Sequence, residues 1–169
     1  MVADCVALIA DFNPDVTDLL EISFHEKKEV AFRAAWMLEY IMKHRPSVFA
    51  AHMHELLELL PEQKNHSAMR HYAKIIALLT ARNAEPIYQS LSESIDFTEV
   101  INVLFSWLID PEMLVATKVH CMQSLANLVP RYKWIKDDLL ATVDHLVDLE
   151  TIAFFARARQ IRKQLKKIK

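Results

Sequence analysis

The sequence predicts an all-α fold, built from paired helices that repeat along the chain. The 169 residues include no glycine, where average usage would give about 12 in a chain of this length. No segment alternates apolar and polar residues strictly enough to indicate a β-strand. Four segments share one spacing of apolar residues, and that spacing is the period of an amphipathic helix.

The lack of glycine also excludes several classes of enzyme. Dinucleotide-binding loops, P-loops and the nucleophile elbow of hydrolases all need glycine where the backbone turns sharply or approaches a phosphate. Apolar residues make up 53% of the chain and charged residues 25%, so we do not expect a disordered protein. The length suits a single domain over residues 1–169, large enough to bury a core.

Prolines and capping residues divide the chain into its expected helices. Asn13-Pro14 and Asp110-Pro111 are each typical of an N-cap followed by a first-turn proline, and Asp96 begins a segment similar to a capping box. The remaining prolines lie between periodic segments. In order, the expected helices are 2–11, 14–24, 28–44, 47–60, 66–82, 86–94, 97–109, 111–128, 131–147 and 150–168.

Four of these helices can be aligned on their apolar stripes. The aligned stripes begin at Val30, Met69, Val115 and Phe154, with copies separated by 39, 46 and 39 residues. Four positions later stand Ala34, Ala73, Val119 and Ala158, most of them small enough to let a neighbouring helix approach. Another amphipathic helix precedes each copy. Helix pairs at roughly 40–47 residues are typical of HEAT and armadillo repeats, so we predict a HEAT/armadillo-like α-α superhelix, a right-handed solenoid of about four helical pairs.

The chain also resembles, along nearly its whole length, a group of short bacterial HEAT-like proteins. The matching stretches include Trp36–Glu39, Ser67–Ile75, Trp107–Ile109, Val115–Lys118, Tyr132–Ile135 and Ala156–Arg159. Proteins of this group are often called adenylosuccinate lyases. The resemblance therefore implies a HEAT-like fold and names one enzyme as a remote alternative.

The residues do not support that lyase activity. True adenylosuccinate lyases are much longer, and their catalytic loop has a Ser-Ser-x-Met-Pro-x-Lys-type core. Only Ser67-Ala68-Met69 is similar to it, Arg70 stands at the proline position, and the segment lies within a predicted helix. No histidine spacing suits a metal and no serine or threonine sits in a nucleophile elbow. We therefore expect a non-catalytic protein without metal or cofactor.

Cysteine usage and hydropathy bear on the compartment. Cys5 and Cys121 lack metal-type spacing and are expected to be small buried residues in a reducing environment. The N-terminus has no basic segment typical of a signal peptide. The strongly apolar run from Val100 to Ile109 is too short to span a membrane, which takes roughly 20 residues. We expect a cytoplasmic protein with no membrane partner.

Charge is unevenly distributed along the chain. Residues 1–150 hold 13 Lys and Arg against 22 Asp and Glu, a balance of −9, whereas residues 151–169 hold seven basic residues and no acid. Such an asymmetry can mark contact with nucleic acid or with a membrane, or it can reflect a solvated last helix whose cations favour the C-terminal end of the helix dipole. The sequence leaves open whether helix 150–168 caps the stack.

Basic residues recur beside the second stripe position of each aligned helix, and they form a candidate partner-binding ladder. The ladder comprises Arg33, Tyr72, Lys74, Lys118, His120, Arg157 and Arg159. In a solenoid, equivalent positions align along one face. These side chains either bind an acidic peptide or phosphate, or pair internally with carboxylates of adjoining helices. The large aromatic residues are expected to fill gaps between repeats rather than to stack on bases.

The sequence thus favours a module that presents a concave, locally basic face to an unknown protein or acidic peptide. The alternative is a nucleic-acid-binding HEAT-like protein that uses the ladder and the basic C-terminal residues. The oligomeric state and the identity of the partner stay open.

Overall fold

The computed structural model describes residues 13–168, which form helices and no strand. In chain order the helices are α2 (Val16–Ile22), α3 (Lys28–His44), α4 (Pro46–Ala50), α5 (Met53–Leu59), the 3-10 turn η1 (Leu60–Glu62), α6 (His66–Leu79), α7 (Pro86–Ser94), α8 (Thr98–Ile109), α9 (Val115–Leu128), α10 (Ile135–Val147) and α11 (Ile152–Leu165).

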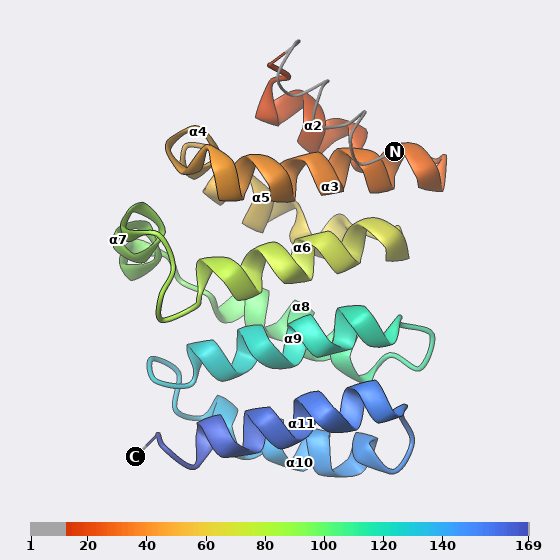
Figure 1. The fold of residues 1–169 in the computed structure, drawn as a ribbon, viewed down its shortest axis with the longest axis vertical. Coiled ribbons are helices and arrows are strands. Elements are labelled where there is room, and N and C mark those ends of the chain that lie inside the picture. Colours follow the sequence, from red (N-terminus) through yellow and green to blue (C-terminus); the bar gives the residue numbers. More distant parts are fainter. Residues whose placement is uncertain (1–12, 169) are drawn as a thin grey trace.

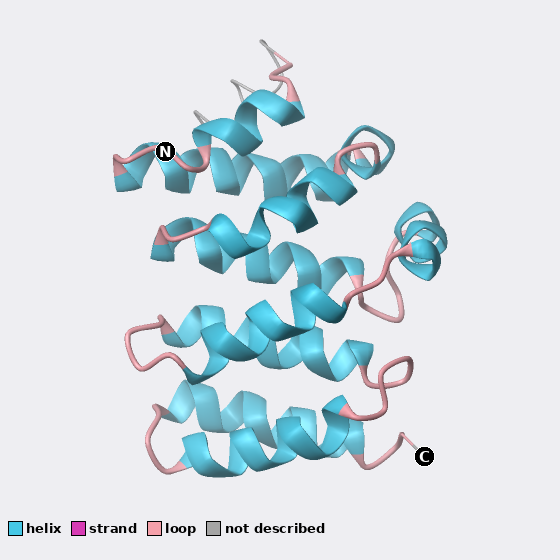
Figure 2. Cartoon of the chain, turned by 180° about the vertical axis from the view of Figure 1, so that it is seen from behind, coloured by secondary structure: helices cyan, strands magenta, loops and turns pink. Residues whose placement is uncertain are grey.

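The helices stack in two layers, with the N-terminal and C-terminal parts of the chain at opposite ends (Figure 1). Helices α3, α6, α9 and α11 lie side by side and form the front layer, in which each packs on the next. Helices α2, α5, α8 and α10 form the back layer, seen from behind in Figure 2. Helix α7 projects from one side of the stack. The arrangement is that of successive helical pairs.

One hydrophobic cluster runs through both layers, from Val16 to Leu165. The predicted stripe supplies much of it: Ala34, Ala73 and Ala158 are buried, and Val119 is half-buried against the cluster. The alanines leave room for neighbouring front-layer helices, while long side chains such as Ile76 fill the space between the layers. Truncation of a fully buried isoleucine to alanine costs about 2–5 kcal/mol, so substitutions along this stripe would unfold the stack.

Three tyrosines connect helices that are distant in sequence. The Tyr88 hydroxyl donates to the Met42 carbonyl at 2.7 Å, and the Phe97 amide donates to the Tyr132 hydroxyl at 2.8 Å. The Tyr72 hydroxyl lies 2.8 Å from the Ser23 hydroxyl, which itself donates to a backbone carbonyl, so Tyr72 is the donor. Burial raises the pKa of Tyr72 to about 12. The expectation that aromatic residues fill gaps between repeats is confirmed for these three.

The segment 47–60, expected as one helix, is divided in the structure. Helix α4 ends at Ala50, α5 begins at Met53, and a 3-10 turn follows it. His52 has φ −107° and ψ 8°, outside the helical range, and its ring lies 3.2 Å from the Thr17 hydroxyl of α2. The break in the local helical pattern thus coincides with a tertiary contact to α2, which lies before α3 in the chain.

Several predicted helix starts were also wrong; the expected helix 131–147, for example, begins only at Ile135. The expected helix 111–128 begins only at Val115, because the Asp110 carboxylate accepts a hydrogen bond from the Glu112 amide at 2.9 Å and forms a turn. Helix α2 is capped by Asp15 rather than Asn13: its carboxylate accepts from the Thr17 amide at 2.7 Å. The expected helix 2–11 and Cys5 lie outside the described residues.

Candidate functional site: a basic groove between α6, α9 and α11

The predicted ladder does not occupy one face. Arg33 and Arg159 are exposed, but Tyr72 is fully buried and Lys118 is only 1% exposed, so the prediction of a shared face was wrong for these two. The alignment preserved the spacing along each helix but not the rotation of the helix about its own axis. One residue corresponds to about 100° of that rotation, enough to turn a surface position into the core.

Lys118 is a structural residue. Its ammonium lies 2.5 Å from the carboxylate of Glu150, in the connection between α10 and α11. The Glu150 side chain is itself only 14% exposed, so the pair is almost wholly removed from water. Its two charges compensate each other, and neither is free to meet a partner.

Lys74 is likewise paired internally. The buried Glu39 carboxylate of α3 accepts from Lys43 at 2.5 Å, from His71 at 2.8 Å and from Lys74 at 2.6 Å. Burial alone would raise the pKa of Glu39, but the hydrogen bonds from these three donors outweigh it and hold that pKa well below its usual range. Sequence reasoning missed Glu39 as an organising residue, although the i, i+4 spacing of Glu39 and Lys43 was a readable signal.

Arg157 meets a different kind of partner. Its guanidinium donates to the Gln123 side-chain carbonyl at 3.0 Å. The Gln123 amide donates in turn to Asn127 at 2.8 Å and to Gln164 at 3.1 Å. These amides carry no charge, so the network orients Arg157 across the junction of α9 and α11 without neutralising it.

The pKa of His120 reflects the positive electrostatic potential of this region. The half-buried ring lies on α9, between α6 and α11, and its pKa falls to about 4. Burial contributes most to the shift, followed by the positive charges of Lys74, Arg157 and Arg70. The imidazole is therefore neutral at pH 7, and the cations of two neighbouring helices converge on it.

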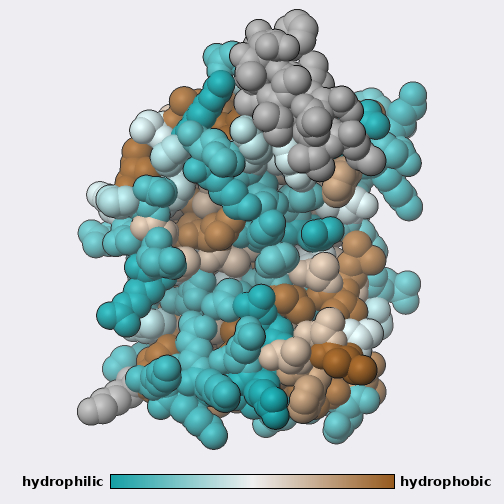
Figure 3. Space-filling model, in the orientation of Figure 1, coloured by the Kyte–Doolittle hydropathy of each residue, from teal (hydrophilic) through white to brown (hydrophobic). Residues whose placement is uncertain are grey.

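Arg70, His120 and Arg157 line a pocket of about 520 Å³, which we call the α6–α9–α11 groove. Its polar lining is Arg70, His120, Thr151, Arg157 and Gln160. Its apolar lining is Val115, Ala116, Val119, Ala153 and Ala156. No carboxylate lines it. Figure 3 shows apolar side chains gathered over the N-terminal ends of α9 and α11, within a largely hydrophilic surface.

Comparison with known families was informative in one respect. A family model described as a HEAT repeat domain matches residues 1–165. The chain is a HEAT-repeat protein. The predicted fold class and the resemblance to HEAT-like proteins are thereby confirmed. No curated protein and no solved structure matches the chain. HEAT repeats form scaffolds whose extended surfaces often bind other proteins.

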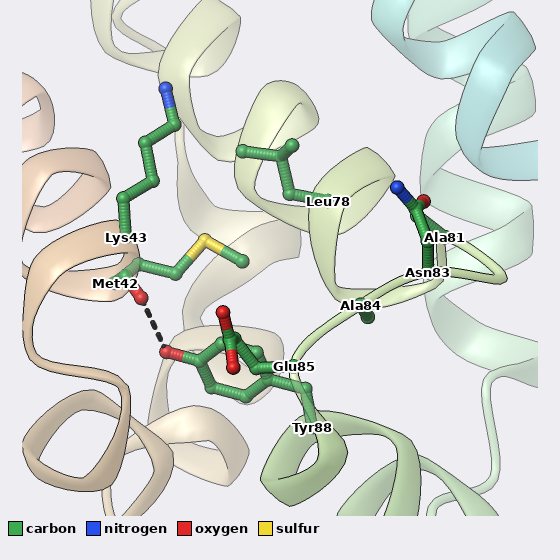
Figure 4. A pocket seen from close by; sticks show the side chains of 8 residues that line it. All are labelled: Met42, Lys43, Leu78, Ala81, Asn83, Ala84, Glu85 and Tyr88. Atoms are coloured by element: carbon green, nitrogen blue, oxygen red, sulfur yellow. Dashed lines mark hydrogen bonds between the residues drawn. The ribbon is translucent and has the colours of Figure 1, made fainter.

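A second pocket of this HEAT-repeat protein, about 190 Å³, lies beside the C-terminal ends of α3 and α6 (Figure 4). Lys43 and Glu85 both contribute to its lining, so it is electrostatically mixed. Lys43 is already paired with Glu39, and the Tyr88 hydroxyl is bonded to the Met42 carbonyl. Compared with the α6–α9–α11 groove, this pocket offers less uncompensated charge.

Neither a metal centre nor a membrane span is found among the described residues. Residues 13–168 contain no group of three His, Cys, Asp or Glu side chains that could hold a metal ion. In the same range, no helix combines the length and apolar character needed to cross a bilayer. Cys121 is a buried free thiol, as expected, and burial raises its pKa.

Proposed function

We propose that this HEAT-repeat protein is a non-catalytic interaction module that binds an acidic segment of a protein partner in the α6–α9–α11 groove. One observation supports the proposal above all. Arg70 and Arg157 line the groove, and neither forms an ion pair within residues 13–168. Lys74 and Lys118 are ion-paired with Glu39 and Glu150, whereas these two arginines have no ion-pair partner among the described residues.

The groove also provides an apolar surface for the partner. Val119 and Ala156 line the same pocket as the two arginines. Interfaces gain most of their affinity from apolar anchors, while charged groups at the margin add specificity and register. The best ligand is therefore an acidic segment that also carries apolar side chains.

Arg157 is preorganised for this role. Its hydrogen bond to Gln123 holds one edge of the guanidinium and leaves the other N–H groups available to a ligand. A side chain that is ordered before binding loses less entropy when the partner arrives. Arg70 is exposed on α6, so it can adjust to the ligand that Arg157 positions.

A nucleic-acid partner is the second candidate. Arg159, Lys163, Lys166 and Lys167 of the C-terminal region are exposed, and they form no ion pair within the described part of the chain. Phosphate contacts along such a row would make the affinity fall steeply with salt, at a slope of about −0.7 to −0.9 per contact. The acidic balance of residues 1–150 opposes extended contact with a nucleic acid.

An array of acidic 12-residue peptides, each beside its Asn and Gln counterpart, tests the proposal. The wild-type protein should bind a subset of the acidic peptides and none of the neutral counterparts. Arg70→Glu with Arg157→Glu should remove that binding, because two carboxylates would then line the groove. Arg82→Glu with Lys133→Glu makes the same charge change at two exposed residues outside the groove and should leave binding intact.

Thermal unfolding of both double variants controls for folding. Peptide binding that persists in the folded Arg70→Glu, Arg157→Glu variant would refute the groove as the site. Binding of single-stranded oligonucleotides in place of acidic peptides, with a steep salt dependence, would replace the proposal with the nucleic-acid alternative.

A further inference from the structure

We infer that the group bound between Arg70 and Arg157 is a phosphate monoester, carried by a phosphorylated side chain of the bound segment. This inference rests on the proposed function and specifies the chemistry of its ligand. It is drawn from the number of free donors, the number of uncompensated charges and the position of a neutral imidazole in the α6–α9–α11 groove.

The donors available in the groove exceed what one carboxylate can use. A guanidinium presents five N–H groups. Of those on Arg157, one is bonded to Gln123, and Arg70 has no side-chain partner among the described residues. A carboxylate has two oxygens and is satisfied by one bidentate arginine, whereas a phosphate monoester presents three acceptor oxygens. Two arginines on separate helices suit the larger group.

The charges give the same result. Three cations lie near His120; Lys74 is ion-paired with Glu39, so the two that have no ion-pair partner among the described residues are Arg70 and Arg157. A phosphate monoester carries a charge of about −1.5 to −2 at pH 7, a carboxylate −1 and a phosphodiester −1. The monoester alone balances both arginines at a single point.

His120 completes the site as a neutral donor. Because its pKa is about 4, the imidazole at pH 7 has one N–H and no charge, and it lines the same pocket as the arginines. A neutral donor can bond the third phosphate oxygen without adding repulsion to a pair of arginines. The apolar lining formed by Val119 and Ala156 suits the residues that flank a phosphorylated side chain in a peptide. It suits a ribose-phosphate chain less well.

Three degenerate peptide libraries with the same random flanking residues test the inference. They hold phosphoserine, glutamate or serine at the centre, and their binding is measured by fluorescence polarisation at pH 7.5. We expect the phosphoserine library to bind at least tenfold more tightly than the glutamate library. At pH 5, where the phosphate is a monoanion, most of that preference should be lost.

The variant Arg70→Lys with Arg157→Lys keeps both positive charges but loses the fork geometry of guanidinium. It should weaken binding of the phosphoserine library more than binding of the glutamate library, and so reduce the preference for phosphoserine. Inorganic phosphate at millimolar concentration should compete with the phosphoserine library in the wild-type protein.

The outcomes separate the inference from the proposed function. Equal affinity for the phosphoserine and glutamate libraries would overturn the inference and leave the acidic-segment proposal in place. A failure of both libraries to bind would overturn both. Competition by a single-stranded oligonucleotide more effective than competition by inorganic phosphate would overturn the monoester in favour of a phosphodiester ligand.

Discussion

Two junctions of the front layer treat their basic residues in opposite ways. Between α3 and α6, the buried Glu39 carboxylate collects Lys43, His71 and Lys74 within 2.8 Å. Between α9 and α11, Arg157 meets only the neutral amide of Gln123. The first junction uses its charges to hold two helices together. The second connects its helices through side-chain amides and leaves Arg157 without an ion-pair partner among the described residues.

The number of basic residues on a face therefore does not determine the electrostatic potential of that face. Lys74 and Lys118 carry the same single positive charge as Arg157, but each lies within 2.6 Å of a carboxylate. A basic residue is available to a partner only where no acidic residue of a neighbouring segment lies beside it. Substitutions that add or remove a carboxylate at either junction therefore test whether its basic residues are paired internally or available to a partner.

The largest expected effect is at the α3–α6 junction. Glu39→Ala removes the acceptor of three donors, so it leaves the buried His71 without its hydrogen-bond partner and the half-buried Lys74 without a counter-charge, and it should destabilise the protein by about 3–5 kcal/mol. Urea unfolding followed by circular dichroism measures this. Glu29→Ala is the matched control, since Glu29 is exposed on the same helix, and it should change the stability by less than about 0.5 kcal/mol. Equal effects of the two substitutions would contradict the role given to Glu39.

Breaking the ion pair between Lys118 and Glu150 should have a smaller effect on stability. A double variant that removes both charges is the control. Lys118→Ala leaves Glu150 uncompensated and should cost about 2–3 kcal/mol, less than a fully buried charge because Glu150 can reach water. Lys118→Met with Glu150→Gln keeps the side-chain volumes and removes both charges, so it should cost less than about 1 kcal/mol. A larger loss in the double variant than in Lys118→Ala would show that the pair itself is strongly stabilising.

The two junctions should lose stability in different pH windows. The folded state keeps His120 neutral, with a pKa of about 4 against its ordinary value of 6.5. The unfolded chain therefore binds a proton first, and stability falls as the pH drops from about 6.5 to 4, by about 1–2 kcal/mol for a half-exposed ring. Glu39, whose pKa is lowered in the fold, adds a further loss only below about pH 4.5.

Unfolding free energies measured from pH 8 to pH 3.5 separate these contributions. His120→Gln should flatten the upper window and leave the lower one unchanged. Glu39→Gln should do the reverse. A profile that is unchanged by His120→Gln would show that this ring is not held neutral by its surroundings.

The smallest expected effect on stability comes from a substitution that gives the α9–α11 junction a carboxylate, as the α3–α6 junction already has. Gln123→Glu places a carboxylate 3.0 Å from the Arg157 guanidinium, where the amide carbonyl now lies. Stability should change by less than about 1 kcal/mol, while binding of acidic peptides should weaken about tenfold, or about 1.4 kcal/mol. The nearby Gln160→Glu lines the same groove but has no described bond to Arg157, and it should weaken binding less. Identical losses for both would mean that general charge, not pairing, controls the site.

The sequence alone predicted the features that depend on spacing within one helix. The stripe of Ala34, Ala73 and Ala158 was predicted correctly because apolar periodicity is local. Three features were not predictable in this way. Lys118 meets Glu150 across 32 residues, His71 meets Glu39 across 32 residues, and His52, where the expected helix 47–60 breaks, meets Thr17 across 35 residues. Each depends on how one helix is rotated against another, which periodicity does not determine.

The candidate site was anticipated only in part. His120 and Arg157 belong to the predicted ladder and line the groove, whereas Arg70 was absent from it because it lies three residues before Ala73 rather than beside it. Arg33 and Arg159 are exposed but do not line this groove. A role for them in partner binding stays a prediction.

The most direct test follows the arginine side chains themselves. The Nε–H signals of an arginine-labelled protein are recorded by NMR while the tightest-binding acidic peptide of the array is added. The account predicts that the signals of Arg70 and Arg157 shift together and saturate at the measured Kd, while those of Arg82 and Arg131 stay in place. A peptide that binds and saturates without moving the Arg70 and Arg157 signals would contradict the α6–α9–α11 groove as the binding site.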